Sequence, residues 1–380
     1  MARATSNPDN RLFIDLKALE HNLAVLRGLL PAGCRVAGVV KADAYGHGLL
    51  PVARRLKAAG AEALAVAVAA EGAALRHAGV AGPIWLLLGV RPPQARQAAL
   101  LDLTPICADL EAFRALHAAG QALGRPVSCQ LKVDTGMSRL GVPHGQALEF
   151  LEQLKALDGI RLTGLASHLA TAGDPASGQA VEQAGRFAGL LAAARQAGWP
   201  LADSSLSGSG GVMVPPPASP GPPAFARLGI GLYGCLPDPA CAGLADLRPV
   251  MSFSTRLLAV RPAPAGSLVS YGATWRAEQD TWLGVLPVGY SDGYPRALSN
   301  RANVLVSGHL APVRGRVCMN LTMVDLGHLP ALPVMGQEVM LLGRQAGGQI
   351  SADQLGDWAG TISYEITCGL GAANRRRTLA

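Results

Sequence analysis

The stretch RVAGVVKADAYGHGLLPVARRLKAA, residues 35–59, contains one complete unit of the fold. Its first part, Arg35–Val40, is a short and mostly apolar run, typical of a strand that is buried on both faces. Its last part, Leu49–Ala59, is a longer Ala/Leu-rich stretch of helical character. A polar turn that begins with Lys41 separates them. The stretch therefore predicts a strand followed by a helix, the repeating unit of a parallel sheet.

The same alternation continues as far as residue 235. Further helical stretches include Leu110–Leu123, His144–Leu157 and Gln179–Ala197. The expected strands are Arg35–Val40, Ala63–Val68, Pro83–Leu88, Leu103–Cys107, Val127–Val133, Arg161–Ser167, Leu201–Ser205 and Ala226–Leu232. These repeats predict an α/β fold, a closed TIM-like (β/α)8 barrel. The alternative is a doubly wound open sheet. That fold is expected to carry a G-x-G-x-x-G turn after the first strand, and no such turn follows Val40.

After about residue 240 the pattern changes to short β-branched runs bounded by Gly, Pro and Asp. They predict a second, mostly β domain. The runs are Met251–Val260, Thr281–Val288, Asn303–Val306, Met319–Asp325 and Glu338–Leu342. We expect the barrel to occupy residues 11–240 and the C-terminal β domain residues 241–380, with residues 1–10 as a candidate addition to the latter. The run Leu12–Ile14 precedes the first barrel strand and is a candidate to return to the β domain.

Composition excludes several classes of protein. Of the 380 residues, 49% are hydrophobic and 16% are charged, so the chain can bury a large core and is not disordered. The net charge of +7 favours anionic ligands. The one dense basic run, Arg375–Arg377, has no interleaved aromatic residues and is expected to be a solvated tail. We therefore expect no nucleic-acid partner.

The cysteines and the N-terminus indicate the compartment. The seven cysteines are widely spaced and contain no C-x-x-C pair, which argues against a disulfide framework or a zinc site and suits a reducing compartment. The polar segment Met1–Asn10 has no apolar part of a secretory signal, and no apolar stretch is long enough to span a bilayer. We expect a cytoplasmic protein without a membrane partner.

Lysine is rare in this chain, which has only five lysines, and two of them fall on expected barrel strands or their ends. An arginine stays protonated, whereas a lysine amine can be made neutral and nucleophilic. Lys41 ends the first strand, at the face of a barrel where active sites gather, and it is either a solvated lysine or one that forms an imine. Lys132 lies within the fifth strand and either pairs with Asp134 or points into the barrel.

Three further features follow later strands. Arg139 comes after a Gly-containing turn and is either a surface residue or a fork that holds a carboxylate. His168 ends the sixth strand without a second residue at ligand spacing, so we expect no metal. Ser207–Gly211 and Arg227–Gly231 follow the seventh and eighth strands, where barrels commonly bind phosphate through backbone N–H groups. Together with Lys41, these features predict pyridoxal 5'-phosphate held as a lysine imine.

The segment Val39–Gly48 resembles the lysine signature of the alanine racemase family. The resemblance continues in order through Leu131–Gly141, Gly164–Ala172, Arg227–Gly234, Val269–Trp275, Val288–Arg296, Gly315–Met319 and Tyr364–Ile366. It implies a fold-type III pyridoxal-phosphate enzyme, an isomerase that interconverts L- and D-alanine and supplies D-alanine for cell-wall peptidoglycan. It also implies a head-to-tail homodimer with active sites at the subunit interface.

The resemblance also implies roles at matching positions. Lys41 would hold the cofactor and act as one catalytic base, and Tyr271, reaching the site from the partner subunit, would be the opposing base. Arg139 and the Met319 backbone would meet the amino-acid substrate, and Lys132 matches a position that is often carbamylated in the family. The remaining cofactor-binding residues would be Tyr45, His168, Ser209, Arg227, Gly229, Ile230 and Tyr364, with Arg227 at the pyridine nitrogen and His168 against the ring.

The chemistry supports a pair of bases. Racemisation removes a proton from one face of Cα and returns one to the other, which needs bases on opposite sides. Lys41 and Tyr271 are different residue types from different expected domains, so they can lie on opposite faces. A tyrosine, with an ordinary pKa of about 10, needs cationic neighbours to act as a base, and Arg139 and Arg296 are the candidates.

The chain departs from the family pattern at Asn320, where Asp is usual, at Ser207–Ser209, where Asn-Ser is usual, and at Ser138, where Gly is usual. Asn320 changes the charge beside the substrate pocket, so a broader or serine-preferring racemase stays an alternative. A non-catalytic pyridoxal-phosphate carrier is another, although such modules can end after the barrel and Tyr271 lies beyond it. A decarboxylase or aldolase on the same barrel is disfavoured by the arginine expected at the ring nitrogen.

Overall fold

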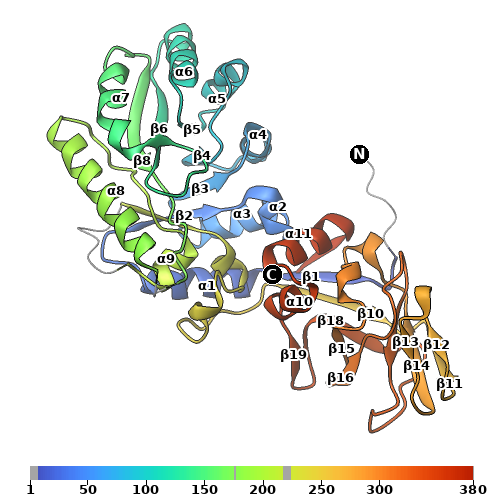
Figure 1. Ribbon diagram of the computed structural model, residues 1–380. Coiled ribbons are helices and arrows are strands. Elements are labelled where there is room, and N and C mark those ends of the chain that lie inside the picture. Colours follow the sequence, from blue (N-terminus) through green and yellow to red (C-terminus); the bar gives the residue numbers. More distant parts are fainter. Residues whose placement is uncertain (1–6, 175–176, 217–223, 380) are drawn as a thin grey trace.

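The computed structural model describes residues 7–174, 177–216 and 224–379. A barrel of parallel strands with surrounding helices comes first, and a β-rich domain follows it (Figure 1). Both parts of the predicted architecture are therefore confirmed. Among the described residues, no helix combines the length and the apolar character that a membrane span requires.

The barrel is a closed ring of parallel strands. Its order is β9–β2–β3–β4–β5–β6–β8, and Ser205 bridges Ala166 of β8 and Phe225 of β9 to close it. Closure distinguishes a (β/α)8 barrel from the doubly wound alternative. The strands are β2 (Arg35–Val39), β3 (Ala63–Val66), β4 (Ile84–Leu86), β5 (Thr104–Cys107), β6 (Val127–Asp134), β8 (Ile160–Ala166) and β9 (Phe225–Leu228), with the short β7 (Val142–Pro143) beside β6.

The seventh expected strand, Leu201–Ser205, is reduced to the bridge at Ser205. The segment still belongs to the ring, because the Asp203 N–H donates to the Thr163 carbonyl and the Ser205 N–H donates to the Leu165 carbonyl, both at 2.8 Å. These bonds keep the barrel closed although the ladder is too short to count as a strand.

The eighth expected strand, Ala226–Leu232, is too long at its C-terminal end. The strand β9 ends at Leu228, because Gly229 turns the backbone (φ −121°, ψ −105°) into the 3-10 helix η3 (Ile230–Tyr233). This turn brings the backbone N–H groups of Gly229 and Gly231 to the carboxyl end of the barrel.

Helices cover the outside of the barrel (Figure 1). They are α1 (Leu16–Gly28), α3 (Leu49–Ala58), α4 (Ala69–His77), α5 (Ala95–Leu100), α6 (Leu110–Leu123), α7 (Ala147–Leu154), α8 (Gly178–Gln196) and the short α9 (Ser209–Met213). The prediction for Leu110–Leu123 is confirmed, and two other predicted helices differ by one residue at their ends. The predicted helix His144–Leu157 begins as the 3-10 turn η2 (His144–Gln146) and ends at Leu154.

The β domain contains a large mixed sheet, with the path β16–β15–β18–β10–β1–β20, and a smaller sheet, β11–β14–β17. Four of the five predicted runs contain a whole strand, and the fifth, Glu338–Leu342, ends before its strand β18 does. The strands are β1 (Arg11–Asp15), β10 (Met251–Arg256), β11 (Ala259–Ala263), β12 (Leu268–Val269), β13 (Trp275–Arg276), β14 (Thr281–Leu286), β15 (Asn303–Val306), β16 (His309–Pro312), β17 (Thr322–Asp325), β18 (Glu338–Gln345), β19 (Gly348–Ile350) and β20 (Arg376–Leu379).

The two ends of the described chain meet in the large sheet. The strand β1 pairs with β10 and, in parallel, with β20. Residues 11–15 therefore belong to the sheet of the β domain and not to the barrel range 11–240, because their backbone bonds are made there. The side-chain amides of Asn7 and Asn10 donate to the Pro287 carbonyl of the same domain at 3.0 and 3.4 Å, whereas residues 1–6 of the predicted addition lie outside the described residues.

Two features of the C-terminal region differ from the sequence prediction. The helices α10 (Ala352–Ala359) and α11 (Ser363–Ala373) fall where the helical pattern was expected to fade. The run Arg375–Arg377 is not a solvated tail, because β20 begins at Arg376 and pairs with β1. The helix α11 packs closely on the turn after β2, since a Cβ on Gly371 would overlap the carbonyl oxygen of Gly46.

The connection between the two domains is fixed by Asn22 of α1. Its fully buried side-chain amide donates to the carbonyls of Leu232 and Arg248 at 3.0 and 2.7 Å, and its oxygen accepts the Arg248 N–H at 2.7 Å. Arg248 lies in the segment that leads from the barrel into β10.

We predict that Asn22→Ala lowers the free energy of unfolding by about 3 kcal/mol, because buried backbone groups lose their partners. Urea denaturation followed by circular dichroism measures the change. The matched control is Lys17→Ala, an exposed position on the same helix, which is expected to change it by less than about 0.5 kcal/mol. An Asn22→Ala protein as stable as this control would contradict the assignment.

Candidate active site

Lys41 follows β2 and opens a turn of unusual geometry, α2 (Lys41–Tyr45). The four residues after Lys41 all have positive φ, from 53° to 56°, and none of them is glycine. A left-handed conformation costs an L-residue roughly 1–2 kcal/mol. Such a turn persists only where its surroundings hold it, and such places cluster at active sites.

Two carboxylates of the barrel hold this turn. The Ala42 N–H donates to Glu71 of α4 at 2.7 Å, and the Leu49 N–H, at the start of α3, donates to Asp43 Oδ1 at the same distance. The first bond fixes the residue next to Lys41, and the second ties the middle of the turn to the following helix. The position of Lys41 is therefore set by its neighbours on both sides.

The Lys41 amine lies half-buried at the carboxyl end of the barrel. Burial lowers the pKa of Lys41, and the positive charges of Arg139 and Arg227 lower it further. The side chain is thus in the environment of a reactive amine rather than that of a solvated lysine.

Lys132 of β6 shares this environment. Burial lowers the pKa of Lys132 to about 7, with Arg227 and Arg139 as further causes. Asp134, its alternative partner, accepts the N–H groups of Gly136 and Met137, each at 2.8 Å, and its charge acts on Lys132 in the opposite sense by raising the pKa of the amine. Lys132 is therefore close to the cations at the barrel mouth and also within the influence of Asp134.

Arg227 of β9 is buried beside His168. Its guanidinium donates to Ser205 Oγ at 2.6 Å and to the Leu206 carbonyl at 3.0 Å, and it lies 3.1 Å from His168 Nδ1. Burial lowers the pKa of His168 to about 2, and the charges of Arg227 and Lys132 add to this effect. The imidazole is therefore neutral at physiological pH, and its Nδ1 accepts the hydrogen bond from Arg227.

Arg139 follows the loop after β6 and is exposed at the barrel mouth. Ser138 before it has a φ of 54°, the left-handed region that glycine, usual here in the family, adopts without strain. Its charge contributes to the lowered pKa values of Lys41, Lys132 and His168, so the structure brings these residues to one place.

A second group of predicted residues forms a cradle beside this cluster. Ser209 Oγ accepts the N–H groups of Gly229 and Gly231 at 3.0 and 3.2 Å. The Tyr45 hydroxyl lies so near that a Cβ on Gly229 would come within 2.6 Å of it. The Tyr364 ring of α11 lies 5.7 Å from the Tyr45 ring. Ile230, buried, begins the 3-10 turn that presents these N–H groups.

Tyr45 is held by a residue that sequence reasoning missed. The rings of Tyr45 and Tyr233 lie 4.8 Å apart, and the Tyr233 hydroxyl donates to the Val39 carbonyl at 2.9 Å. Burial raises the pKa of Tyr45, so its hydroxyl keeps its proton and can donate to an anion. Only its place within the motif Arg227–Gly234 could have drawn attention to Tyr233.

The cluster has an unbalanced positive charge. None of the ion pairs between described side chains involves Lys41, Lys132, Arg139 or Arg227. Cations gathered in a partly buried site are stable only with an anionic counterpart. The arrangement therefore fits an anionic ligand next to an amine.

Tyr271 and Met319 lie apart from this cluster, in the β domain. The two residues are 72% and 56% exposed. The strands β12 and β13, which flank Tyr271, lie at the side of the β domain that faces away from the barrel (Figure 1). Tyr271 and Met319 are thus predicted site residues that do not reach the barrel mouth of their own chain.

The cation beside the Tyr271 turn is Arg316, which sequence reasoning did not select. A Cβ on Gly272 would lie 2.9 Å from Arg316 Nη1, so the guanidinium rests on the backbone next to Tyr271. The Arg316 carbonyl accepts the Ser270 hydroxyl at 2.6 Å, which joins the two loops. The only sequence signal that could have pointed to Arg316 is its position within the motif Gly315–Met319.

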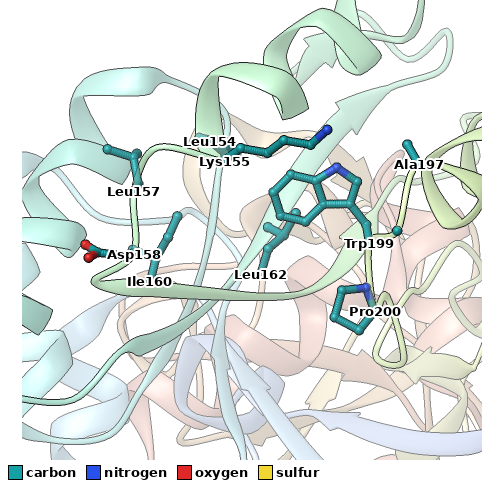
Figure 2. A pocket seen from close by; sticks show the side chains of 10 residues that line it. Leu154, Lys155, Leu157, Asp158, Ile160, Leu162, Ala197, Trp199 and Pro200 are labelled. Carbon is teal, nitrogen blue, oxygen red and sulfur yellow. The ribbon is translucent and has the colours of Figure 1, made fainter.

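A hollow of about 310 Å³ lies at the opposite, amino end of the barrel (Figure 2). Apolar side chains from the start of β8 and from the segments before β8 and after α8 line it: Leu154, Leu157, Ile160, Leu162, Trp199 and Pro200. It contains none of the predicted site residues. Barrel enzymes hold their active sites at the carboxyl end, so the charged cluster is the candidate.

The fold and the cluster define a class: a (β/α)8-barrel protein with an appended β domain and a cationic, lysine-bearing barrel mouth. Within that class the comparisons are specific. The chain matches the family models "Alanine racemase, N-terminal domain" over residues 14–237 and "Alanine racemase, C-terminal domain" over residues 250–378. The chain belongs to the alanine racemase family, a family of isomerases.

Individual relatives agree over almost the whole length. The alanine racemase of Syntrophobacter fumaroxidans is 40% identical over 358 residues, 94% of each chain. A crystal structure of alanine racemase from Streptomyces lavendulae matches with a TM-score of 0.90 at 33% identity, covering 99% of this chain and 98% of that one. A crystal structure of alanine racemase from Bartonella henselae is described with covalently bound pyridoxal phosphate. It matches with a TM-score of 0.87 at 26% sequence identity, covering 98% of this chain and 100% of that one.

The low pKa of His168 leads to a testable expectation. With a pKa of about 2, the imidazole stays neutral across the range from about pH 5 to pH 8 where histidines usually gain a proton. Nitrogen-15 NMR of histidine-labelled protein, with His168→Gln to assign the signal, should show no titration of this ring in that range. A His168 signal with a midpoint near pH 6 would show that the cations do not surround it as described.

Proposed function

We propose that this chain interconverts L- and D-alanine with pyridoxal 5'-phosphate bound to Lys41, and that Lys41 and the partner subunit's Tyr271 are the two bases. The observation that carries the proposal is the set of unbalanced cations around the Lys41 amine at the barrel mouth. Family membership supplies the substrate class, and the Bartonella henselae relative supports the cofactor.

The residues present fit this cofactor. Ser209, Gly229, Ile230, Tyr45 and Tyr364 would hold its phosphate, because the Gly229 N–H and Ser209 Oγ, which bond to each other in this structure, lie in one cradle with Tyr45 and Tyr364. Burial raises the pKa of Tyr364 to about 12, so this hydroxyl also keeps its proton. Arg227 would face the ring nitrogen, and the neutral His168 would pack against the ring. When bound, the cofactor withdraws electrons from an attached amino acid and makes its α-proton acidic.

The chain's own residues then move and place the proton. The Lys41 amine, with its lowered pKa, takes or returns a proton on one face of the substrate Cα. The phenol oxygen of the partner subunit's Tyr271 serves the other face, with Arg316 as its cationic neighbour. Arg139 holds the substrate carboxylate through its fork, and the Met319 backbone of the β domain completes the pocket.

The position of Tyr271 supports a head-to-tail homodimer. The loops that carry Tyr271, Tyr290 and Met319 are joined, because the Tyr290 N–H donates to the Cys318 carbonyl at 3.1 Å and Ser270 Oγ lies 3.3 Å from Cys318 Sγ. All three side chains are exposed although they are large and apolar. A group of such side chains supports an interface, and a second copy is the partner that would bring Tyr271 to Lys41.

The cellular setting is part of the same proposal. The cysteine pattern supports a reducing, cytoplasmic compartment. The D-alanine product would be used for cell-wall peptidoglycan, as the resemblance implies.

The alternative is a racemase that prefers serine, and one observation weighs against it. The Asn320 amide donates to Ser291 Oγ at 2.7 Å, and Ser291 Oγ donates to the Met319 carbonyl at 2.8 Å. The amide is thus used inside the loop and is less available to a substrate hydroxyl. The ratio of kcat/KM for L-alanine to that for L-serine separates the two.

Subunit complementation tests the two bases and the dimer together. We predict that Lys41→Ala and Tyr271→Phe are each inactive as homodimers, and that mixing them under conditions of subunit exchange restores about a quarter of the wild-type activity, because half of the dimers regain one complete site. Proton NMR in D2O with L-alanine measures exchange at Cα and formation of the D form.

The control is a mixture of Lys41→Ala with the double variant Lys41→Ala/Tyr271→Phe. No dimer in this mixture can form a complete site. A mixture that stays inactive although subunit exchange is demonstrated would contradict a Tyr271 contributed by the partner. Activity that survives in Lys41→Ala would contradict the role of Lys41.

Lys132 leads to a separate prediction. Its pKa of about 7 leaves much of the amine neutral above neutral pH, and a neutral amine combines with CO2, losing one proton, to give an anionic carbamate. Such an anion would balance the charge of Arg139 and Arg227. We predict that CO2-depleted buffer at about pH 8 lowers kcat severalfold, that bicarbonate restores it, and that Lys132→Met is slow and insensitive to CO2. Equal responses of wild type and Lys132→Met would contradict the modification.

A further inference from the structure

Arg376 of the β domain contacts the Lys41 turn of the barrel. Its Nη2 donates to Asp43 Oδ2 at 2.5 Å, and its Nε donates to the Gly46 carbonyl at 2.6 Å. A further bond from Nη2, 2.8 Å long, goes to the Gly371 carbonyl of α11. The Arg376 side chain is only 11% exposed, whereas the side chain of its partner Asp43 is 44% exposed.

The contact with Arg376 is a third support of the turn, in addition to the two supports from the barrel. Glu71 holds it at Ala42 and the start of α3 holds it at Asp43, but both of these belong to the barrel. On the other side α11 leaves no space, since a Cβ on Gly46 would overlap the Thr367 carbonyl oxygen. Arg376 thus supplies the charged contact between the β domain and the turn, directed at the second oxygen of the Asp43 carboxylate.

We infer that Arg376 is a positioning residue for the reaction, which acts through Asp43 and the left-handed turn to fix the Lys41 amine. The inference rests on the proposed role of Lys41 as a base. A turn of four non-glycine residues in the left-handed region relaxes when a support is lost, and Lys41 is the residue at which it begins. Proton transfer is sensitive to small displacements of the base.

The chemistry of the side chain favours positioning over a simple charge pair. The planar fork of arginine reaches three acceptors at once, whereas a lysine ammonium on a flexible chain cannot reproduce this arrangement. Arg376→Lys should therefore keep the charge and lose part of the geometry. Arg376→Met loses both.

The test uses the purified holoenzyme with pyridoxal phosphate bound. We expect kcat for L-alanine to fall at least about tenfold in Arg376→Met, with Arg376→Lys in between, while KM changes less than about threefold. The visible absorption band of the lysine-bound cofactor should persist but change its pH dependence, because the Lys41 nitrogen has moved. The matched control is Arg377→Met, the next residue of β20, which is exposed, lies over the Phe13 ring and should behave as wild type.

A second variant covers a failure of Arg376→Met to fold. Asp43→Asn removes the ion pair but keeps an oxygen for the Leu49 N–H, and it should show the same loss of kcat; the double variant Asp43→Asn/Arg376→Lys should lose little more than Asp43→Asn alone. Wild-type kcat per bound cofactor in these variants, or a loss that only follows the fraction of folded protein, would overturn the inference. A failure of the proposed function is recognised separately, because wild type would then not racemise alanine or Lys41→Ala would keep racemising it.

Discussion

The structure depends on one strained element, the left-handed turn of Ala42–Tyr45 that follows β2. The barrel brings the chain to this point, but it does not by itself keep four L-residues in that conformation. The turn is held by Glu71 and the start of α3 from the barrel and by Arg376 and α11 from the β domain. The β domain therefore helps to position Lys41, and the site depends on both domains of the chain.

Electrostatics explains why the site is built for an anion. Arg227 satisfies its hydrogen bonds with neutral oxygens and a neutral imidazole, so its charge is not cancelled locally. Burial is the largest cause that lowers the pKa of Lys41 and Lys132, and the charges of Arg139 and Arg227 lower both pKa values further. The same charges that help to make these amines reactive also attract a phosphate.

Sequence reasoning succeeded where the physical signal is local. Buried parallel strands are apolar runs, so the barrel and the residues at its mouth could be predicted. It failed where tertiary contacts determine the backbone conformation. The strand β9 ends earlier than predicted, before Gly229. The left-handed turn Ala42–Tyr45 was not predicted, because it contains no glycine to indicate positive φ. Arg375–Arg377 looked like a solvated tail because nothing in its own sequence shows that β1 lies beside it.

The β domain has two roles that point in opposite directions. Through β20 and α11 it contacts the barrel of its own chain at the Lys41 turn, and the strands β12 and β13, which flank the exposed Tyr271, lie on its side away from that barrel. In the proposed dimer each β domain would thus steady one base in its own subunit and supply the other base to its partner. Within one site, Lys41 would then be held by the β domain of its own subunit and the second base by the β domain of the partner, so their separation across the substrate would depend on packed secondary structure in both subunits and on the dimer interface.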